Sequence, residues 1–313
     1  MVTAPVQRLR LPVIVSVTAG DAHPRRHEER LRAALSAAAV PIFSYPQTLS
    51  ALREAVAAEA ESGATHIAVA GGDGTLHHAV NALEGRTVAI VPIPIGSGND
   101  FSRALGVGAD LSQLEKTLAT PQTRRIDLIE VNGRRVCTVA GAGIVADTGL
   151  QVGRLLAPGS RARPIAKRLG RSAYLLAAAA RLTFARRVVK DAEIRWRDPK
   201  GTWFEWEGRL HGLFLANLPT LGAGLRLPFA SQMTDGAFEL AVLPQSSRRR
   251  LMWSLGCLRS NRKLPAGTMI IERTSEVQIR WKGGSRVIGD GEDLGFVEEI
   301  NARSLPNALT VGV

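Results

Sequence analysis

The stretch THIAVAGGDGT, residues 65–75, decides the fold of the first part of this chain. Its first six residues, which end in the apolar IAVA, are typical of a buried strand, and the two glycines after them are typical of a sharp turn. A helical pattern begins at Leu76, so the stretch predicts a strand, a glycine turn and a helix in succession. Such a turn lets the backbone approach a phosphate closely, and the start of the helix adds N–H donors.

Two side chains of this turn suit phosphate chemistry. Asp73 can hold Mg²⁺ directly or through water, and Thr75 can cap the helix or donate a hydrogen bond to a phosphate. The same residues also suit a plain strand-to-helix turn with a capping aspartate, so the motif alone leaves both interpretations open. It is not a Walker A loop, because no lysine follows the glycines, and it is not a GxGxxG motif.

The segments around this stretch alternate between strand-like and helix-like patterns. The expected strands are residues 11–17, 40–44, 65–70 and 87–95, and the expected helices are residues 24–39, 48–60 and 76–83. Alternation of this kind predicts an α/β domain with a parallel sheet covered by helices. Ligands of such sheets bind beyond the carboxyl ends of the strands, where the glycine turns lie.

The pattern changes after about Asp127. Short strand candidates follow at residues 135–140, 188–197, 203–216, 237–243, 276–281 and 286–289, and a basic helical stretch interrupts them at 161–187. We therefore expect a second domain, a mainly antiparallel β-sandwich over residues 127–302, after a first domain over residues 1–126. The final ALTVGV reads as one more strand, and the sequence leaves open whether residues 303–313 return to the first domain.

A second glycine-rich turn, PIGSGND at residues 94–100, also follows a strand. Its glycines flank Ser97, so backbone amides and the Ser97 hydroxyl could wrap a phosphate or a ribose. Asp100 adds a second carboxylate at the same edge of the sheet. A plain helix-start loop with Asn99 or Asp100 as the N-cap fits these residues equally well.

Two further acidic features lie later in the chain. Asp127 stands at the start of the second domain, and the tripeptide Asp290-Gly291-Glu292 follows a strand-like run. Glu292 is a candidate general base, and Gly291 would allow a sharp turn. DGE is also a common hairpin signal, so this motif in isolation favours a simple turn.

Composition narrows the class of protein. The 313 residues carry a net charge of +12, which favours acidic partners such as nucleic acid, an anionic membrane or phosphorylated ligands. Aromatic residues make up only 5%, so platforms for stacking bases would be sparse. No apolar run reaches the roughly 20 residues that cross a bilayer, and no signal peptide is visible. We therefore expect a cytoplasmic protein.

Two basic clusters suit either a solvated helical face or docking to anionic lipid headgroups. The first cluster consists of Arg161, Arg163, Lys167, Arg168 and Arg171. The second consists of Arg248, Arg249 and Arg250, and it lies beside Leu251, Met252 and Trp253.

The four acidic and glycine-rich motifs together resemble those of the diacylglycerol-kinase-like lipid kinases, especially the soluble bacterial members, which are related to sphingosine and ceramide kinases. GGDGT, PxGxxND, Asp127 and DGE stand in the family's order and at about its spacing. The resemblance covers essentially the whole chain. It extends to a second-domain pattern formed by Asn217, Gly222, Gly224, Pro228, Ala230, Asp235 and Gly236.

This resemblance implies two domains with ATP bound between them, Mg²⁺ as cofactor and Glu292 as the proton acceptor. Asp73, Asp100 and Asp127 would form a water-linked magnesium network, with Asp73 also catalytic. A second, structural magnesium would bind Asp235 and the main-chain carbonyls of Gln232 and Ala237. The nucleotide-binding residues that the resemblance implies are Ser44, Gly71, Gly72, Asp73, Gly74, Thr75, Leu76, His77, Gly96, Ser97, Gly98 and Asn99.

Two positions depart from the family pattern. Ser16-Val17 stands where the family usually has Asn-Pro, and His78 replaces the glutamate that commonly follows GGDGT. These departures concern contacts to adenine and ribose, and they remove none of the carboxylates that the chemistry needs. His77 and His78 are adjacent in sequence and point about 100° apart on a helix, so a histidine metal site is not expected.

The expected function is therefore ATP- and Mg²⁺-dependent transfer of the γ-phosphoryl group to a lipid hydroxyl, at an anionic membrane surface and without nucleic acid. The expected acceptor is diacylglycerol-like, although a sphingoid base, phosphatidylglycerol and an undecaprenyl-like alcohol remain open as acceptors. The sequence also leaves open whether the protein forms a homodimer. One alternative is an NAD kinase-like enzyme with a soluble acceptor, against which GND and DGE argue. The other is a non-catalytic nucleotide- or lipid-binding module, against which Asp73 and Glu292 argue.

Overall fold

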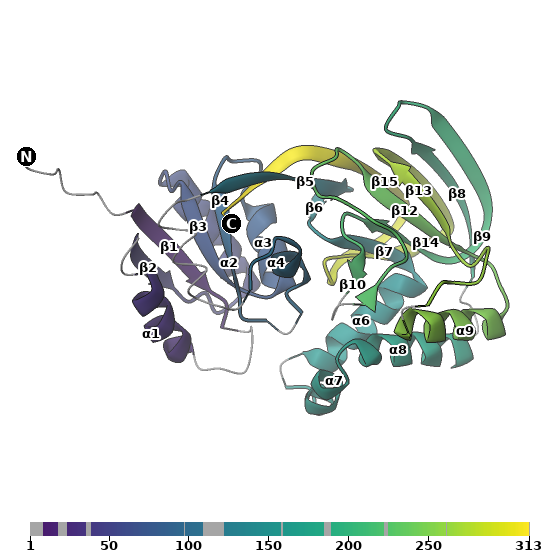
Figure 1. The fold of residues 1–313 in the computed structure, drawn as a ribbon, viewed down its shortest axis with the longest axis horizontal. Helices are drawn as coiled ribbons and strands as arrows, with labels where there is room; N and C mark the ends of the chain where they lie inside the picture. Colours follow the sequence, from purple (N-terminus) through teal and green to yellow (C-terminus); the bar gives the residue numbers. More distant parts are fainter. Residues whose placement is uncertain are drawn as a thin grey trace, which may run out of the picture. The chain divides into compact units, whose positions relative to one another are not determined.

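The computed structural model describes residues 9–17, 24–35, 39–96, 98–108, 122–157, 159–184, 189–221, 225–260 and 262–312. The chain divides into two compact units (Figure 1). Unit 1 consists of Met1–Arg125 and Leu309–Val313, and unit 2 consists of Ile126–Ala308.

Unit 1 is built on a parallel sheet with the strand order β2-β1-β3-β4-β15. Its strands are β1 (Leu9–Val15), β2 (Ala39–Ser44), β3 (His66–Gly71), β4 (Ala89–Pro94) and the end of β15 (Glu292–Gly312). Every neighbouring pair in this order runs parallel. The last residues of the chain thus belong to unit 1, where Thr310 pairs with Ala89.

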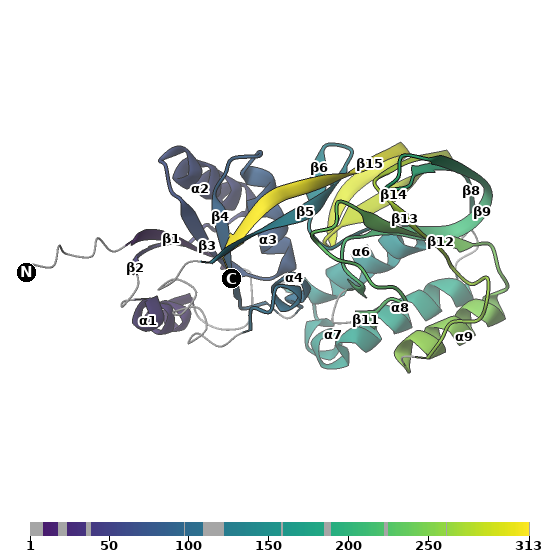
Figure 2. The same cartoon turned by 45° about the horizontal axis from the view of Figure 1, so that its top comes forward.

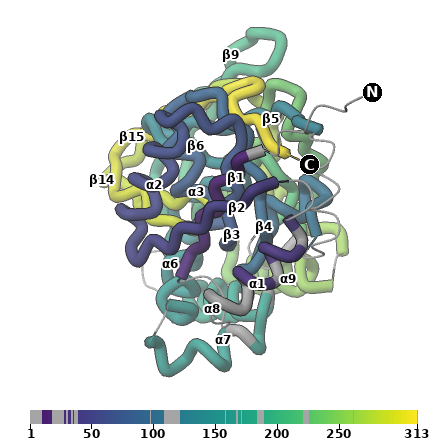
Figure 3. The backbone as a smooth tube through the Cα atoms, turned by 90° about the vertical axis from the view of Figure 1, so that its left-hand side faces the viewer, coloured from purple at the N-terminus to yellow at the C-terminus, as the bar shows by residue number. Residues whose placement is uncertain are grey.

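Helices cover both faces of this sheet, because its strands are apolar on both faces. Leu31 and Leu35 of α1 (Pro24–Leu35) pack on one face with Val13 and Ala68. Helices α2 (Leu49–Glu61) and α3 (Asp73–Ala82) contact each other, and α2 also contacts β1 and β3. Figures 2 and 3 show the strands running between α1 on one side and α2 and α3 on the other.

The order of the strands creates a switch point at the carboxyl edge of the sheet. From β1 the chain moves outward to β2 and then returns to β3 on the other side of β1. The carboxyl ends of β1 and β3 therefore border the crevice where open α/β sheets bind ligands. The backbone N–H of Ser16 donates to the carbonyl of Ala70 at 2.9 Å, so the segment that follows β1 stays beside the end of β3.

Unit 2 is built mainly on antiparallel strands. These strands are β7 (Val139–Gly143), β8 (Lys190–Arg197), β9 (Trp203–Ala216), β12 (Phe238–Pro244), β13 (Ile270–Thr274) and β14 (Glu276–Gly289). The long strands β9 and β14 pair with β8 in their first halves and with β7 in their second halves. Most of β15 also belongs to this unit and pairs antiparallel with β14. The remaining strands are β5 (Thr123–Val131), β6 (Arg134–Val136), β10 (Thr220–Leu221) and β11 (Leu225–Arg226).

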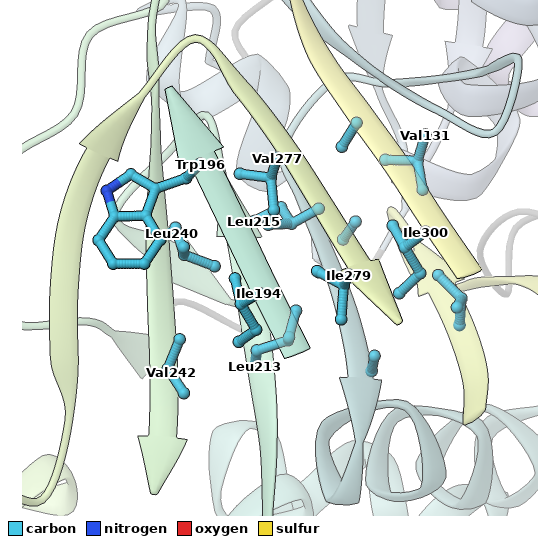
Figure 4. Packing of buried hydrophobic residues seen from close by; sticks show 14 of the residues in the cluster. Val131, Ile194, Trp196, Leu213, Leu215, Leu240, Val242, Val277, Ile279 and Ile300 are labelled. Atoms are coloured by element: carbon cyan, nitrogen blue, oxygen red, sulfur yellow. The ribbon is translucent and has the colours of Figure 1, made fainter. Parts of the chain in front are cut away.

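The main core of unit 2 lies between these strands. Trp196, Leu215, Leu240, Val277 and Ile300 come from five different strands and are all buried in one cluster (Figure 4). Burial of large apolar side chains contributes about 1.5–3 kcal/mol each, so this cluster is the main stabilising feature of the unit.

Unit 2 also contains more helix than the sequence predicts. The expected helical stretch 161–187 is two helices, α7 (Arg163–Leu169) and α8 (Arg171–Phe184), separated by Gly170 with a φ of +52°. Two further helices are α6 (Ile144–Leu156) and α9 (Arg248–Arg259). Helix α6 packs on β7, β9 and β14, α8 packs on α6, and α9 packs on α8. None of the helices in the described part of the chain is long and apolar enough to span a membrane.

Candidate active site

The two glycine-rich turns of unit 1 pack against each other backbone to backbone. A Cβ atom on Gly96 would lie 2.5 Å from the Cα of Gly72, and one on Gly98 would lie 2.7 Å from Oδ2 of Asp73. A Cβ on Gly71 would lie 2.4 Å from the Cβ of Thr75. Side chains at Gly96 and Gly98 would force the two turns apart, and one at Gly71 would clash with Thr75 inside the first turn.

Asp73 joins the two turns through its carboxylate. Its Oδ2 accepts the backbone N–H of Asp100 at 3.1 Å, and its Oδ1 accepts the backbone N–H of Phe101 at 3.0 Å. These donors are the first two amides of α4 (Asp100–Ala104), so Asp73 caps that helix from another part of the chain.

Asn99 presents a buried acceptor beside these turns. Its backbone is left-handed with a φ of +57°, and its Nδ2 donates to the carbonyl of Gly96 at 2.7 Å. Its Oδ1 is buried and has no hydrogen-bond partner among the described residues. A buried unpaired acceptor is costly, so this oxygen marks a position where an external donor would be favourable.

Asp100 is only 6% exposed and forms a 2.6 Å ion pair with Arg103. Arg103 also donates to the carbonyl of Gly98. The guanidinium therefore fixes both the carboxylate and the second glycine turn, and it partly neutralises the acidic charge that Asp73 and Asp100 bring together.

The other nucleotide-binding residues expected in unit 1 belong to the same edge of the sheet. Ser44 is the last residue of β2, Gly71 is the last residue of β3, and the second turn follows β4. Thr75, Leu76 and His77 are buried in the first turns of α3. The expected contact of Ser97 lies outside the described residues.

In unit 2, the carboxylate of Asp127 is held by backbone amides. It is 2% exposed, its Oδ2 accepts the N–H of Gly236 at 2.7 Å, and its Oδ1 accepts the N–H of Asn307 at 2.8 Å. Asp127 therefore ties three distant segments of unit 2 together. Its participation in a magnesium network stays a prediction.

The DGE motif forms a two-residue hairpin turn. Asp290 and Gly291 have φ values of +52° and +89°, and Gly289 pairs with Glu292, as in a type I′ turn. Glu292 is the first residue of β15 and is partly exposed. The backbone of the DGE motif thus forms a hairpin turn, as the tripeptide alone suggests. The catalytic role of the Glu292 side chain stays a prediction.

Asp290 is the residue of this motif that sequence analysis missed. Its side chain is buried and accepts the N–H of Cys137 at 2.9 Å, the N–H of Thr138 at 2.7 Å and the hydroxyl of Thr138 at 2.6 Å. Only the pattern Asp-Gly signalled a turn, and nothing in the sequence signalled a partner more than 150 residues away.

The carboxylate expected to bind a structural magnesium, that of Asp235, is already paired with an arginine. Oδ2 of Asp235 forms a 2.7 Å ion pair with Arg273, and Oδ1 accepts the N–H of Ala237 at 3.1 Å. A metal at Asp235 would compete with this guanidinium, so the structural magnesium with Gln232 stays a prediction. Gly222 and Gly224 of the second-domain pattern lie outside the described residues.

The described residues contain no cluster of three histidine, cysteine, aspartate or glutamate side chains able to hold a metal. The rings of His77 and His78 meet edge to face with centroids 5.4 Å apart, which is a packing contact.

Two family models together match most of the chain. Residues 10–131 match the model described as diacylglycerol kinase catalytic domain, and residues 159–313 match the YegS C-terminal NAD kinase beta sandwich-like domain. These matches confirm the two-domain fold expected from the sequence, with a sandwich-like second domain.

Curated relatives carry the name probable lipid kinase YegS-like. The protein from Pseudomonas aeruginosa strain PAO1 is 30% identical over 249 residues, which are 78% of this chain and 74% of that protein. The protein from Pseudomonas syringae pv. tomato is 30% identical over 265 residues, which are 83% and 78% of the two chains. Among solved structures, a putative diacylglycerol kinase from Bacillus anthracis matches with a TM-score of 0.76 at 18% identity, covering 97% of both chains. That last likeness shows the fold alone.

Proposed function

Since the chain belongs to the diacylglycerol-kinase-like family of lipid kinases, we propose that it transfers the γ-phosphoryl group of ATP to the hydroxyl group of a diacylglycerol-like lipid, with Mg²⁺ as cofactor. The observation that carries this proposal is the contact between the two glycine turns at the carboxyl edge of the parallel sheet. There Asp73 links GGDGT to the amides of Asp100 and Phe101.

The first turn binds the phosphates of ATP. The amides at the start of α3 point beyond the edge of the sheet, and the helix N-terminus carries a partial positive charge that favours phosphate oxygens. The buried Oδ1 of Asn99, which has no hydrogen-bond partner within the described ranges, suits a ribose hydroxyl or a water molecule as donor. Ser44 and Ser97 are the hydroxyl side chains that we assign to the nucleotide.

The oxygen donors of these turns fit Mg²⁺, which prefers carboxylates and usually keeps several waters. Asp73 and Asp100 would hold it in unit 1, and the family pattern assigns Asp127 of unit 2 as well. The ion supplies neutralisation of the charge that develops on the transferred phosphoryl group. The backbone amides and Arg103 hold these carboxylates in place without it.

Glu292 accepts the proton of the lipid hydroxyl. The hydroxyl oxygen attacks the γ-phosphorus, the bond to the bridging oxygen breaks, ADP leaves, and the proton moves to the Glu292 carboxylate. Its position at a rigid hairpin turn supports this role, because a general base must be held within hydrogen-bonding reach of the hydroxyl. Asp73 is the rival base, but we expect its carboxylate to be engaged with Mg²⁺ and the phosphates in addition to the two amides.

We further propose that helices α7, α8 and α9 form a membrane-docking surface on unit 2. Helix α7 contacts α8, and α8 contacts α9. The exposed apolar side chains of this docking surface are Ile165, Leu169, Leu176, Met252 and Trp253. Its exposed basic residues are Arg161, Arg168, Arg248, Arg249 and Arg259, whereas the side chains of Lys167 and Arg171 lie outside the described residues.

Helix α9 has the clearest interfacial pattern. Leu251, Ser254 and Cys257 face the protein, whereas Met252 and Trp253 face outward, and Trp253 is 68% exposed. Exposed large apolar side chains among arginines suit the boundary between headgroups and acyl chains. Each arginine near an anionic surface adds roughly 1 kcal/mol of attraction. This charge pattern selects an anionic bilayer as the partner of the surface.

An NAD kinase-like activity with a soluble acceptor is the second candidate, since the model matched by residues 159–313 is described as NAD kinase-like. The test that separates the two is incubation of the protein with γ-labelled ATP, Mg²⁺ and either a total lipid extract or NAD. Label that moves into organic-extractable material supports the lipid kinase. Label transferred only to the aqueous acceptor supports the NAD kinase-like activity, and no transfer to either supports a non-catalytic module.

A further inference from the structure

We infer that Thr138, Asn217 and Asp290 are positioning residues, which form a buried hydrogen-bond network between the Glu292 turn and Asp127. The inference rests on the proposed function, because it explains how unit 2 holds the base and one carboxylate of the proposed reaction in a fixed relation. All members of the network belong to unit 2.

The network begins at Asp290, two residues before Glu292. The Asp290 carboxylate is 9% exposed and accepts three hydrogen bonds, two of them from Thr138. Its backbone N–H donates to the carbonyl of Val139 at 3.0 Å. A type I′ turn needs no such anchor to form. The anchor therefore fixes the place of the turn, and with it the backbone position of Glu292.

Asn217 carries the network from Thr138 to Asp127. Its backbone N–H donates to the carbonyl of Thr138 at 2.8 Å. Its side-chain amide donates to the carbonyl of Cys137 at 3.1 Å and to the carbonyl of Asp127 at 2.8 Å. Asn217 is 1% exposed, so these bonds form away from bulk solvent. One side chain thus holds the Cys137–Thr138 segment and the backbone of Asp127 together.

The other end of the network is equally constrained. The backbone N–H of Asp127 donates to the carbonyl of Met233 at 2.7 Å, and its carboxylate is held by the amides of Gly236 and Asn307. Between Asp127 and the Glu292 turn, every link is a buried hydrogen bond. Buried polar networks of this kind rigidify a structure when all their members are satisfied.

The test uses Thr138→Val, which keeps the shape and the backbone bonds of Thr138 but removes the hydroxyl donor to Asp290. We expect kcat for lipid phosphorylation to fall roughly tenfold to a hundredfold, as small misplacements of a reacting group typically do. KM for ATP should stay unchanged, and Thr138→Ser should restore kcat. Thr274→Val is the matched control, since Thr274 is also buried in unit 2 and donates its hydroxyl to a carbonyl, that of Arg197, at 2.7 Å.

A double-mutant cycle with Glu292→Gln separates positioning from simple destabilisation. If Thr138 acts through Glu292, Thr138→Val should cause little further loss of kcat in the Glu292→Gln background. Additive losses, or an equal loss of kcat in Thr274→Val at the same melting temperature, would overturn the inference. A wild-type protein that phosphorylates no lipid would instead refute the proposed function itself.

Discussion

Oδ2 of Asp73 accepts a hydrogen bond from the backbone N–H of Asp100 at 3.1 Å, although the two residues belong to different glycine turns. The aspartate expected to hold magnesium therefore also holds the two turns together. Removal of its charge should affect both chemistry and local stability, and the two effects can be measured separately.

For Asp73→Asn we expect the Mg²⁺-dependent transfer rate to fall by at least ~100-fold, as loss of a charged transition-state contact typically does. The asparagine amide would also face one of the two N–H donors, so the free energy of unfolding should fall by about 1–2 kcal/mol. Rates are measured with labelled ATP, and stability by urea unfolding.

Asp198→Asn is the matched control for Asp73→Asn. The Asp198 carboxylate also accepts two backbone amides, those of Lys200 and Thr202, but in the turn between β8 and β9. Both amides bond the same oxygen, Oδ1, which asparagine retains, so this variant should keep its activity. Near-normal turnover in Asp73→Asn would remove Asp73 from the magnesium and phosphate site.

Membrane binding should depend on one exposed tryptophan. Trp253→Ala should weaken binding to anionic vesicles about tenfold, because a large aromatic side chain contributes roughly 1.5–3 kcal/mol when it is buried. Trp203→Ala is the control, since Trp203 is also exposed but lies on β9. The measurement is vesicle co-sedimentation across a range of anionic lipid content.

Salt should weaken the same binding, because attraction to headgroups is screened beyond a Debye length of about 10 Å at 0.1 M. Arg249→Gln should reduce the salt dependence. Equal binding of the wild type to neutral and anionic vesicles would contradict docking by the arginines of α7 and α9, and unchanged binding of Trp253→Ala would contradict insertion of α9.

Arg273 and Mg²⁺ should compete for Asp235. A cation that binds only the folded state raises the melting temperature by mass action. Magnesium should therefore stabilise Arg273→Gln more than the wild type, and Asp235→Ala should lose this response. Arg303→Gln, which breaks the 2.8 Å ion pair with Glu130, is the control. Melting temperatures that are the same in magnesium and in chelator for every variant would exclude a structural magnesium at Asp235.

Glu239 should make unit 2 less stable as the pH rises. Burial raises the pKa of its carboxyl group, and the nearby Arg273 only partly offsets this effect. The folded chain therefore holds the proton more tightly than the unfolded chain, and stability is lost as the pH rises from the unfolded pKa through the folded pKa. Glu239→Gln should gain melting temperature relative to the wild type as the pH rises above the ordinary glutamate value of 4.5. The control Glu298→Gln, at an exposed position of β15, should show no such gain. Parallel curves for Glu239→Gln and the wild type would contradict the raised pKa.

The fold of unit 1 could be predicted from the sequence because the residues that mark its strands and turns are close together in the chain. Apolar runs that end in Gly71 and Pro94 mark the strand ends, and these ends carry the motifs. Other features depend on distant partners. Helix α6 was not predicted, because Gly149 and Gly153 interrupt the helical pattern of its buried face, which Ile144, Thr148 and Val152 form.

The hydrogen bonds around Asp290 illustrate the limit of sequence reasoning for the site. They join residues 152 and 153 positions apart, and no local pattern specifies such a partner. The sequence therefore predicted the turn and the candidate base, but not what holds them in place. The same holds for Asp73, whose capping of α4 requires the fold to bring two turns together.

The proposed phosphoryl transfer to a lipid depends most on Glu292 as its general base. The decisive measurement compares wild type, Glu292→Gln and the control Glu298→Gln with γ-labelled ATP, Mg²⁺ and diacylglycerol in anionic vesicles. Glu292→Gln should bind ATP like the wild type by titration, yet transfer label to the lipid about 10²–10⁴-fold more slowly. Glu298→Gln, exposed on the same strand, should transfer normally. Transfer by Glu292→Gln at the wild-type rate would contradict the account.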